Sequence, residues 1–137
     1  MANIALAANS TACVVESIQQ HTAQCAEDIA PRSPVRFDPA TGKFTLANAT
    51  TAAEAGLYGI STNVVNVKAG GTITAIKRGL MDGFAFTQSY GAAVFLSDTD
   101  GRLGDAAGTV PVKIGTIVSA WAQPIGAAAD KLLSIEL

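Results

Sequence analysis

Short apolar segments alternate with turn residues along this 137-residue chain, which leaves room for strands but for few helices. Residues 35–37 lead through a turn at 38–42 into residues 43–46, where Asp-Pro opens the turn and Gly42 supplies a positive φ. Apolar and polar side chains alternate on both sides of Gly70-Gly71, which predicts a second hairpin of residues 65–68 and 72–76. We expect further strands at 84–86, 94–96, 110–114 and 133–137.

Helical signals are confined to one place. Thr51 and Glu54 have the spacing of a capping box, and Gly56 could end the helix that they begin. The sequence therefore predicts an all-β fold with at most one short helix.

An internal sequence repeat suggests how the strands are organised. The segment from Pro34 to Phe44 aligns without gaps on the segment from Ala93 to Leu103, at an offset of 59 residues. After each copy comes an apolar segment with an internal glycine, Gly59 in the first and Gly115 in the second, where a glycine usually marks a bulge or a close backbone approach. Two copies are too few for a solenoid and fit a small β-barrel or β-sandwich of two related β-units.

The composition narrows the function classes. Charged residues make up 15% of the chain, the net charge is −2, and 26 residues are alanine. Without a basic face or a run of like charge, we expect neither nucleic-acid binding nor docking on anionic lipid. No apolar stretch approaches the roughly 20 residues of a membrane span, and the first residues lack a basic signal region, so we expect synthesis in the cytoplasm. A charge-poor surface can be buried in an assembly without desolvating ions.

Residues that could carry catalysis or bind a metal are few, and we expect neither an enzyme nor a cofactor. His21 is the single histidine and lies in a polar stretch, where a solvated turn is favoured over a general base. Cys13 and Cys25 are expected to be free thiols. The acids between Asp98 and Asp105 could form a calcium loop, but Gly101 comes too early and Thr109 stands where a bidentate Glu should be, which favours a plain turn.

The first twelve residues carry no charge and no clear strand or helix signal. We interpret residues 1–12 as an extended N-terminal arm on a single β-domain of residues 13–137; an edge strand or a frayed terminus is the alternative. Trp121 lies among small residues and either plugs one end of the barrel or is exposed at an interface.

The order of these parts resembles the small capsid cement, or head decoration, proteins of tailed bacteriophages. The likeness is carried by Ser33-Pro34-Val35-Arg36-Phe37-Asp38, the Ala-rich stretch before Leu57-Tyr58-Gly59-Ile60, then Gly70-Gly71-Thr72, and the second unit from Gly91 to Asp98. It covers roughly residues 26 to 137. The family usually has Gly before the Pro-Val pair, where this chain has Ser33.

The resemblance implies a tulip-like β-barrel or β-sandwich that forms a homotrimer. Such a trimer would bind the outer surface of the expanded phage head, in the virion, and clamp neighbouring major capsid protein subunits. Within the arm, we expect Asn3, Ile4, Leu6 and Asn9 to contact the capsid. Two alternatives stay open: another phage structural part, such as a head-fibre base or tail module, and a glycan- or ligand-binding β-module with Trp121 and Tyr90 as an aromatic platform.

Overall fold

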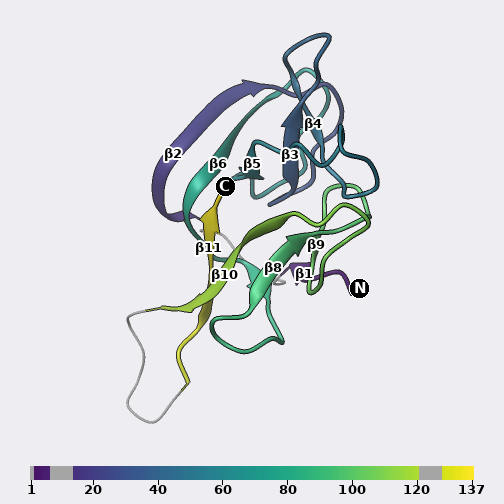
Figure 1. The fold of residues 1–137 in the computed structure, drawn as a ribbon. Helices are drawn as coiled ribbons and strands as arrows, with labels where there is room; N and C mark the ends of the chain where they lie inside the picture. Colours follow the sequence, from purple (N-terminus) through teal and green to yellow (C-terminus); the bar gives the residue numbers. More distant parts are fainter. Residues whose placement is uncertain (1, 7–13, 121–127) are drawn as a thin grey trace.

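A computed structural model describes residues 2–6, 14–120 and 128–137, and within these ranges the protein is all-β, with no helix (Figure 1). The strands are β1 (Ala5–Leu6), β2 (Val14–Gln24), β3 (Pro34–Phe37), β4 (Phe44–Leu46), β5 (Gly59–Ser61), β6 (Thr72–Met81), β7 (Phe84–Ala85), β8 (Ala93–Leu96), β9 (Leu103–Gly104), β10 (Lys113–Ser119) and β11 (Lys131–Glu136).

Most of the strands form one strongly curled sheet in the order β4-β3-β5-β6-β11-β10-β8-β9. β6 and β11 pair antiparallel near the middle of this order. Outward from β6 come β5 and the β3–β4 hairpin, and outward from β11 come β10 and the β8–β9 hairpin. One half is β4-β3-β5-β6 and the other is β9-β8-β10-β11. The predicted barrel or sandwich of two related β-units is thus confirmed, with the two units meeting at the β6–β11 pair.

Equivalent contacts recur in the two units at the offset seen in the sequence. Phe37 pairs with Phe44 in the first hairpin, and Leu96 pairs with Leu103 in the second. The turn of the first hairpin is closed by the Asp38 amide donating to the Lys43 carbonyl, and that of the second by the Ser97 amide donating to the Arg102 carbonyl. Gly42 and Gly101 have φ of 70° and 66°.

The two strand glycines also occupy equivalent places. Val35 of β3 pairs with Gly59, and Val94 of β8 pairs with Gly115. A Cβ at Gly59 would lie 2.2 Å from the Ile76 carbonyl oxygen, and one at Gly115 would lie 1.8 Å from that of Ser134. Of the two expectations for these glycines, a bulge or a close backbone approach, the close approach is confirmed at both, because no side chain fits between these strands. At Gly115 the register of β10 against β8 also shifts.

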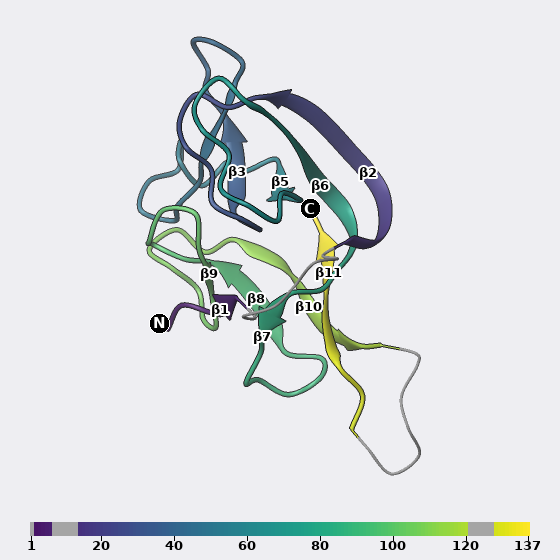
Figure 2. The same cartoon turned by 180° about the vertical axis from the view of Figure 1, so that it is seen from behind.

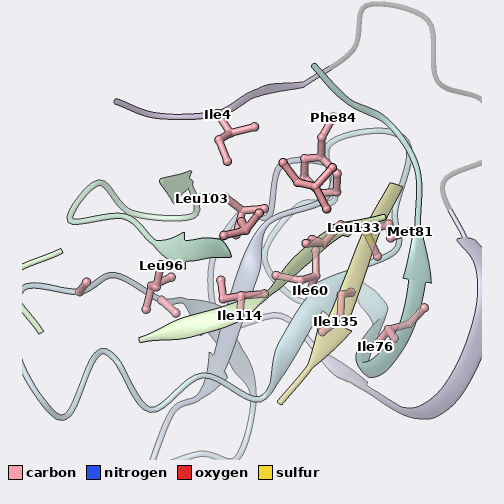
Figure 3. Packing of buried hydrophobic residues seen from close by; sticks show 14 of the residues in the cluster. Ile4, Ile60, Ile76, Met81, Phe84, Leu96, Leu103, Ile114, Leu133 and Ile135 are labelled. Carbon is pink, nitrogen blue, oxygen red and sulfur yellow. The ribbon is translucent and has the colours of Figure 1, made fainter. Parts of the chain in front are cut away.

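The core lies between the two units and is made almost wholly of aliphatic side chains (Figure 3). Fully buried members come from the central strands and from both flanking units: Ile60, Ile76, Met81, Leu96, Ile114, Ile117, Leu133 and Ile135. A second cluster packs under the first hairpin and consists of Cys25, Ile29, Val35, Phe44, Ile73 and Ala75.

Two of the predicted strand assignments differ from the structure. Residues 65–68 do not form a hairpin with 72–76: Val67 bridges Ile29 instead, and residues 72–76 pair with the far end of β2. The strand expected at 110–114 begins only at Lys113. At the predicted capping box, the Thr51 hydroxyl accepts a hydrogen bond from the Glu54 amide at 3.3 Å. The chain makes only a single turn there and forms no helix.

Candidate interaction surface

Residues 2–6 lie against the second unit. The Ile4 amide donates to the Leu103 carbonyl at 2.9 Å, and the Ala2 amide donates to a carboxylate oxygen of Asp105 at 2.9 Å. Beyond them, β1 pairs antiparallel with β7. In this stretch the structure follows the edge-strand alternative and not a detached arm.

The residues of this segment that were predicted to contact the capsid are not equally accessible to a partner. Ile4 is 5% exposed and packs into the core near Leu103 and Phe84 (Figure 3). The Asn3 side chain donates to the Thr99 hydroxyl at 3.3 Å and accepts from the Ser97 hydroxyl. Leu6 is half-buried against the core, and Asn9 lies outside the described residues. Ile4 in this position anchors the segment and offers no surface to a partner.

The longest strand, β2, is the feature that the sequence did not reveal. It runs antiparallel to β6 over the full length of that strand, while β5 and β11 share the other edge of β6. Ten of its eleven residues are exposed, and the strand curves along the outside of the molecule (Figure 2). Within the described parts of the chain, the outer edge of β2 pairs with no other strand.

The side chains of β2 do little to protect this edge. Val14, Val15 and Ile18 are exposed large apolar residues, Ile18 to 67%. Glu16 is the one charged residue between Val14 and Gln24, and the stretch has no lysine or proline. Three register shifts against β6 bend the strand. Charges, prolines and bulges are the usual devices that keep an edge strand from pairing with another chain, and β2 has only Glu16 and these register shifts.

His21 lies on β2 and not in a turn as expected. Its ring contacts three aromatic rings edge-on, with centroid distances of 5.4 Å to Phe37, 5.9 Å to Tyr58 and 6.1 Å to Phe44. Lys77 lies over the Tyr58 ring, 5.6 Å from its centroid. These contacts add packing against Phe37 and Phe44 of the first hairpin, and against Tyr58, to the ladder that attaches β2 to β6.

The acids between Asp98 and Asp105 lie on the β8–β9 hairpin and the loop that follows it, as the turn interpretation predicts. Asp98 accepts hydrogen bonds from the Thr109 amide and hydroxyl, Asp100 accepts from Asn48, and Asp105 accepts from the Ala2 amide. The three carboxylates are thus directed to three separate partners. In the described ranges, no three His, Cys, Asp or Glu side chains are placed to share a metal ion.

Tyr90 lines an open pocket of about 470 Å³ together with Phe84, Phe86 and residues 128–131. The phenol donates to the Ala129 carbonyl, and the Lys131 ammonium lies over the ring, 5.4 Å from its centroid. Trp121, the other member of the suggested platform, lies outside the described residues.

Cys25 is free and buried at the end of β2. Burial raises the pKa of its thiol, and the nearby Asp28 carboxylate raises it further. Such a thiol is a poor nucleophile at neutral pH, which fits a packing role. Cys13 lies outside the described residues.

No protein-family model matches the sequence, and no curated protein matches it either. In the part of the chain that the structure describes, no helix is long and apolar enough to cross a membrane.

Proposed function

We propose that this protein is a structural virion component, a capsid cement protein that binds the outer surface of the expanded phage head as a homotrimer. The proposal draws its identity from the resemblance in the order of the sequence segments. The observation that carries it in the structure is the open edge of β2, which is long, exposed, apolar in part and almost uncharged.

An edge of this kind favours an assembly partner. A strand that presents unpaired amides and carbonyls beside exposed valine and isoleucine side chains is a template for pairing with another chain. Burying it removes apolar surface from water and, apart from Glu16, desolvates no charge. We therefore assign β2 to the contacts that the protein makes within the trimer or with major capsid protein subunits.

A glycan- or ligand-binding module is the second candidate, favoured by the pocket beside Tyr90. A sugar-binding platform needs a free aromatic face, and the Lys131 ammonium already covers one face of this ring. The observations support this candidate less well than assembly through β2.

Co-sedimentation with expanded, undecorated heads tests the proposal. The wild-type protein should pellet with the heads at saturable stoichiometry, and its mass in solution should be that of a trimer. Ile18→Lys should reduce head binding or trimer formation, because it places a charge on the surface to be buried. Val65→Lys is the matched control, since Val65 is exposed to 66% against 67% for Ile18 but lies on a loop.

A wild-type monomer that never pellets with heads would refute the cement function. Equal losses for Ile18→Lys and Val65→Lys would refute the assignment of the contact to β2.

A further inference from the structure

Arg32, in the loop before β3, is buried without a partner for most of its guanidinium. It is 5% exposed, and neither Nε nor Nη1 has a hydrogen-bond acceptor among the described residues. Its φ of 51° is the one positive value recorded for a residue other than glycine in these ranges. Both a buried unpaired cation and a left-handed L-residue are unfavourable in isolation, so such a position usually reflects a function.

Arg32 lines a pocket of about 190 Å³ between the first hairpin and the N-terminal segment. The apolar part of its lining, here called the apolar wall, includes Ile4, Leu6, Leu46, Phe84 and Leu103. Its polar lining includes Ser33, Asn66, Asp28, Asp100 and Arg102. The pocket lining therefore combines apolar residues with two arginines, the buried Arg32 and the exposed Arg102.

The acids at this pocket are already engaged elsewhere. Asp28 accepts from the Lys68 ammonium at 3.3 Å and from the Ala69 amide at 2.9 Å. Asp100 accepts from the Asn48 side chain. The Lys68–Asp28 contact is the one ion pair within the described ranges, so neither acid neutralises Arg32.

We propose that this pocket binds a carboxylate group attached to a short apolar chain, with the Arg32 guanidinium as its main ligand. A planar carboxylate matches the fork of N–H donors that a guanidinium presents. The apolar wall suits the carbons that carry the carboxylate. The Asp28 and Asp100 carboxylates also line the pocket and repel any anion there, but they repel a phosphate dianion more strongly than a carboxylate monoanion, so phosphate fits less well. The carboxylate can belong to a free small acid or to an acidic side chain of a protein partner.

The site is tested first on the free protein, independently of the proposed function. Butyrate is titrated at constant ionic strength while the ¹H–¹⁵N signal of the Arg32 Nε–H is followed by NMR. We expect a saturable shift of that signal, with a Kd on the order of 1–10 mM for so small a ligand. Inorganic phosphate and chloride serve as the comparison anions.

Two variants separate the site from general effects of charge. Arg32→Lys keeps the positive charge but loses the fork of N–H donors of the guanidinium. We expect it to weaken butyrate binding about tenfold, as measured from the NMR signals of neighbouring backbone amides. Arg36→Lys is the matched control and should leave binding unchanged, because Arg36 also has a buried, unpartnered Nε but does not line the pocket. If Arg32→Lys fails to fold, the wild-type titration still tests whether the pocket binds butyrate. The variant Arg102→Gln, at an exposed residue of the pocket, then takes its place, and we expect it to weaken butyrate binding.

The proposal is overturned if butyrate does not shift the Arg32 signal, or if phosphate shifts it and butyrate does not. The source of the natural carboxylate follows from a second arm, in which butyrate is added to protein bound to heads. Release of the protein would identify an acidic side chain of the capsid as the occupant, whereas retention would exclude the capsid as the source and favour a free acid. Failure of head binding altogether would refute the cement function and leave the carboxylate site standing.

Discussion

Replacing Gly115 by alanine tests the two-unit architecture at its tightest point. The added Cβ would lie 1.8 Å from the Ser134 carbonyl oxygen, whereas a carbon–oxygen contact between neighbouring strands needs at least about 3.3 Å. One of the strands β10 and β11 must therefore move by about 1.5 Å, the difference between these two distances.

A displacement of this size would break ladder hydrogen bonds around the Gly115–Ile135 pair. Each buried backbone group left without a partner costs about 1–3 kcal/mol, so the loss of two gives about 2–6 kcal/mol. This is a large part of the roughly 5–15 kcal/mol that holds a typical domain folded.

Urea unfolding followed by circular dichroism, at one fixed protein concentration, measures this loss. Gly59→Ala should behave like Gly115→Ala, because its Cβ would lie 2.2 Å from the Ile76 carbonyl oxygen. Gly56→Ala is the control: its nearest neighbour, the Ala53 carbonyl oxygen, would lie 3.7 Å away, and we expect a change within about 0.5 kcal/mol. A Gly115→Ala protein as stable as the control would refute the close approach of β10 and β11.

Two further predictions concern the N-terminal segment and the response to acid. Ile4→Ala should lower the free energy of unfolding by about 2–4 kcal/mol, because it leaves a cavity in the core. The control Ala5→Ser, at an exposed site, should change the free energy of unfolding by less than about 0.5 kcal/mol. Equally small effects of the two substitutions would mean that residues 2–6 are detached from the core. The Ala69 amide and then the Lys68 ammonium hold the pKa of Asp28 below its ordinary 3.8, so its contribution to stability is present above pH 3.8 and is lost as the pH falls through the lower, folded value. Urea titrations between pH 2 and 5 should show a smaller loss of stability for Asp28→Asn than for the wild type, and identical pH profiles would contradict the assignment.

The sequence was most informative where turns and repeats set the geometry. The turn at residues 38–42 and the equivalent turn before Leu103 fix their hairpins locally, through a positive-φ glycine and an amide-to-carbonyl bond across the turn. The recurrence of Gly59 and Gly115 predicted a bulge or a close backbone approach at both places, and the structure shows the close approach, to β6 at Gly59 and to β11 at Gly115.

The sequence was least informative where a strand has two exposed faces. Residues 14–24 of β2 lack alternation because neither face enters the core, so periodicity gives no strand signal. The prediction at residues 65–68 failed because β2 and β5 pair with residues 72–76, while Val67 bridges Ile29. Arg32 also carries no sequence signal, because its burial depends on elements distant in the chain.

We propose above that the protein assembles on the phage head and that the open edge of β2 is covered there. Hydrogen–deuterium exchange of head-bound protein measures this directly, because amides in a paired edge exchange slowly and those of an open edge exchange fast. We expect the amides of residues 14–24 to exchange as slowly as those of β6, while the exposed loop at residues 64–66 exchanges fast. Fast exchange along the outer edge of β2 in the bound protein would contradict the claim.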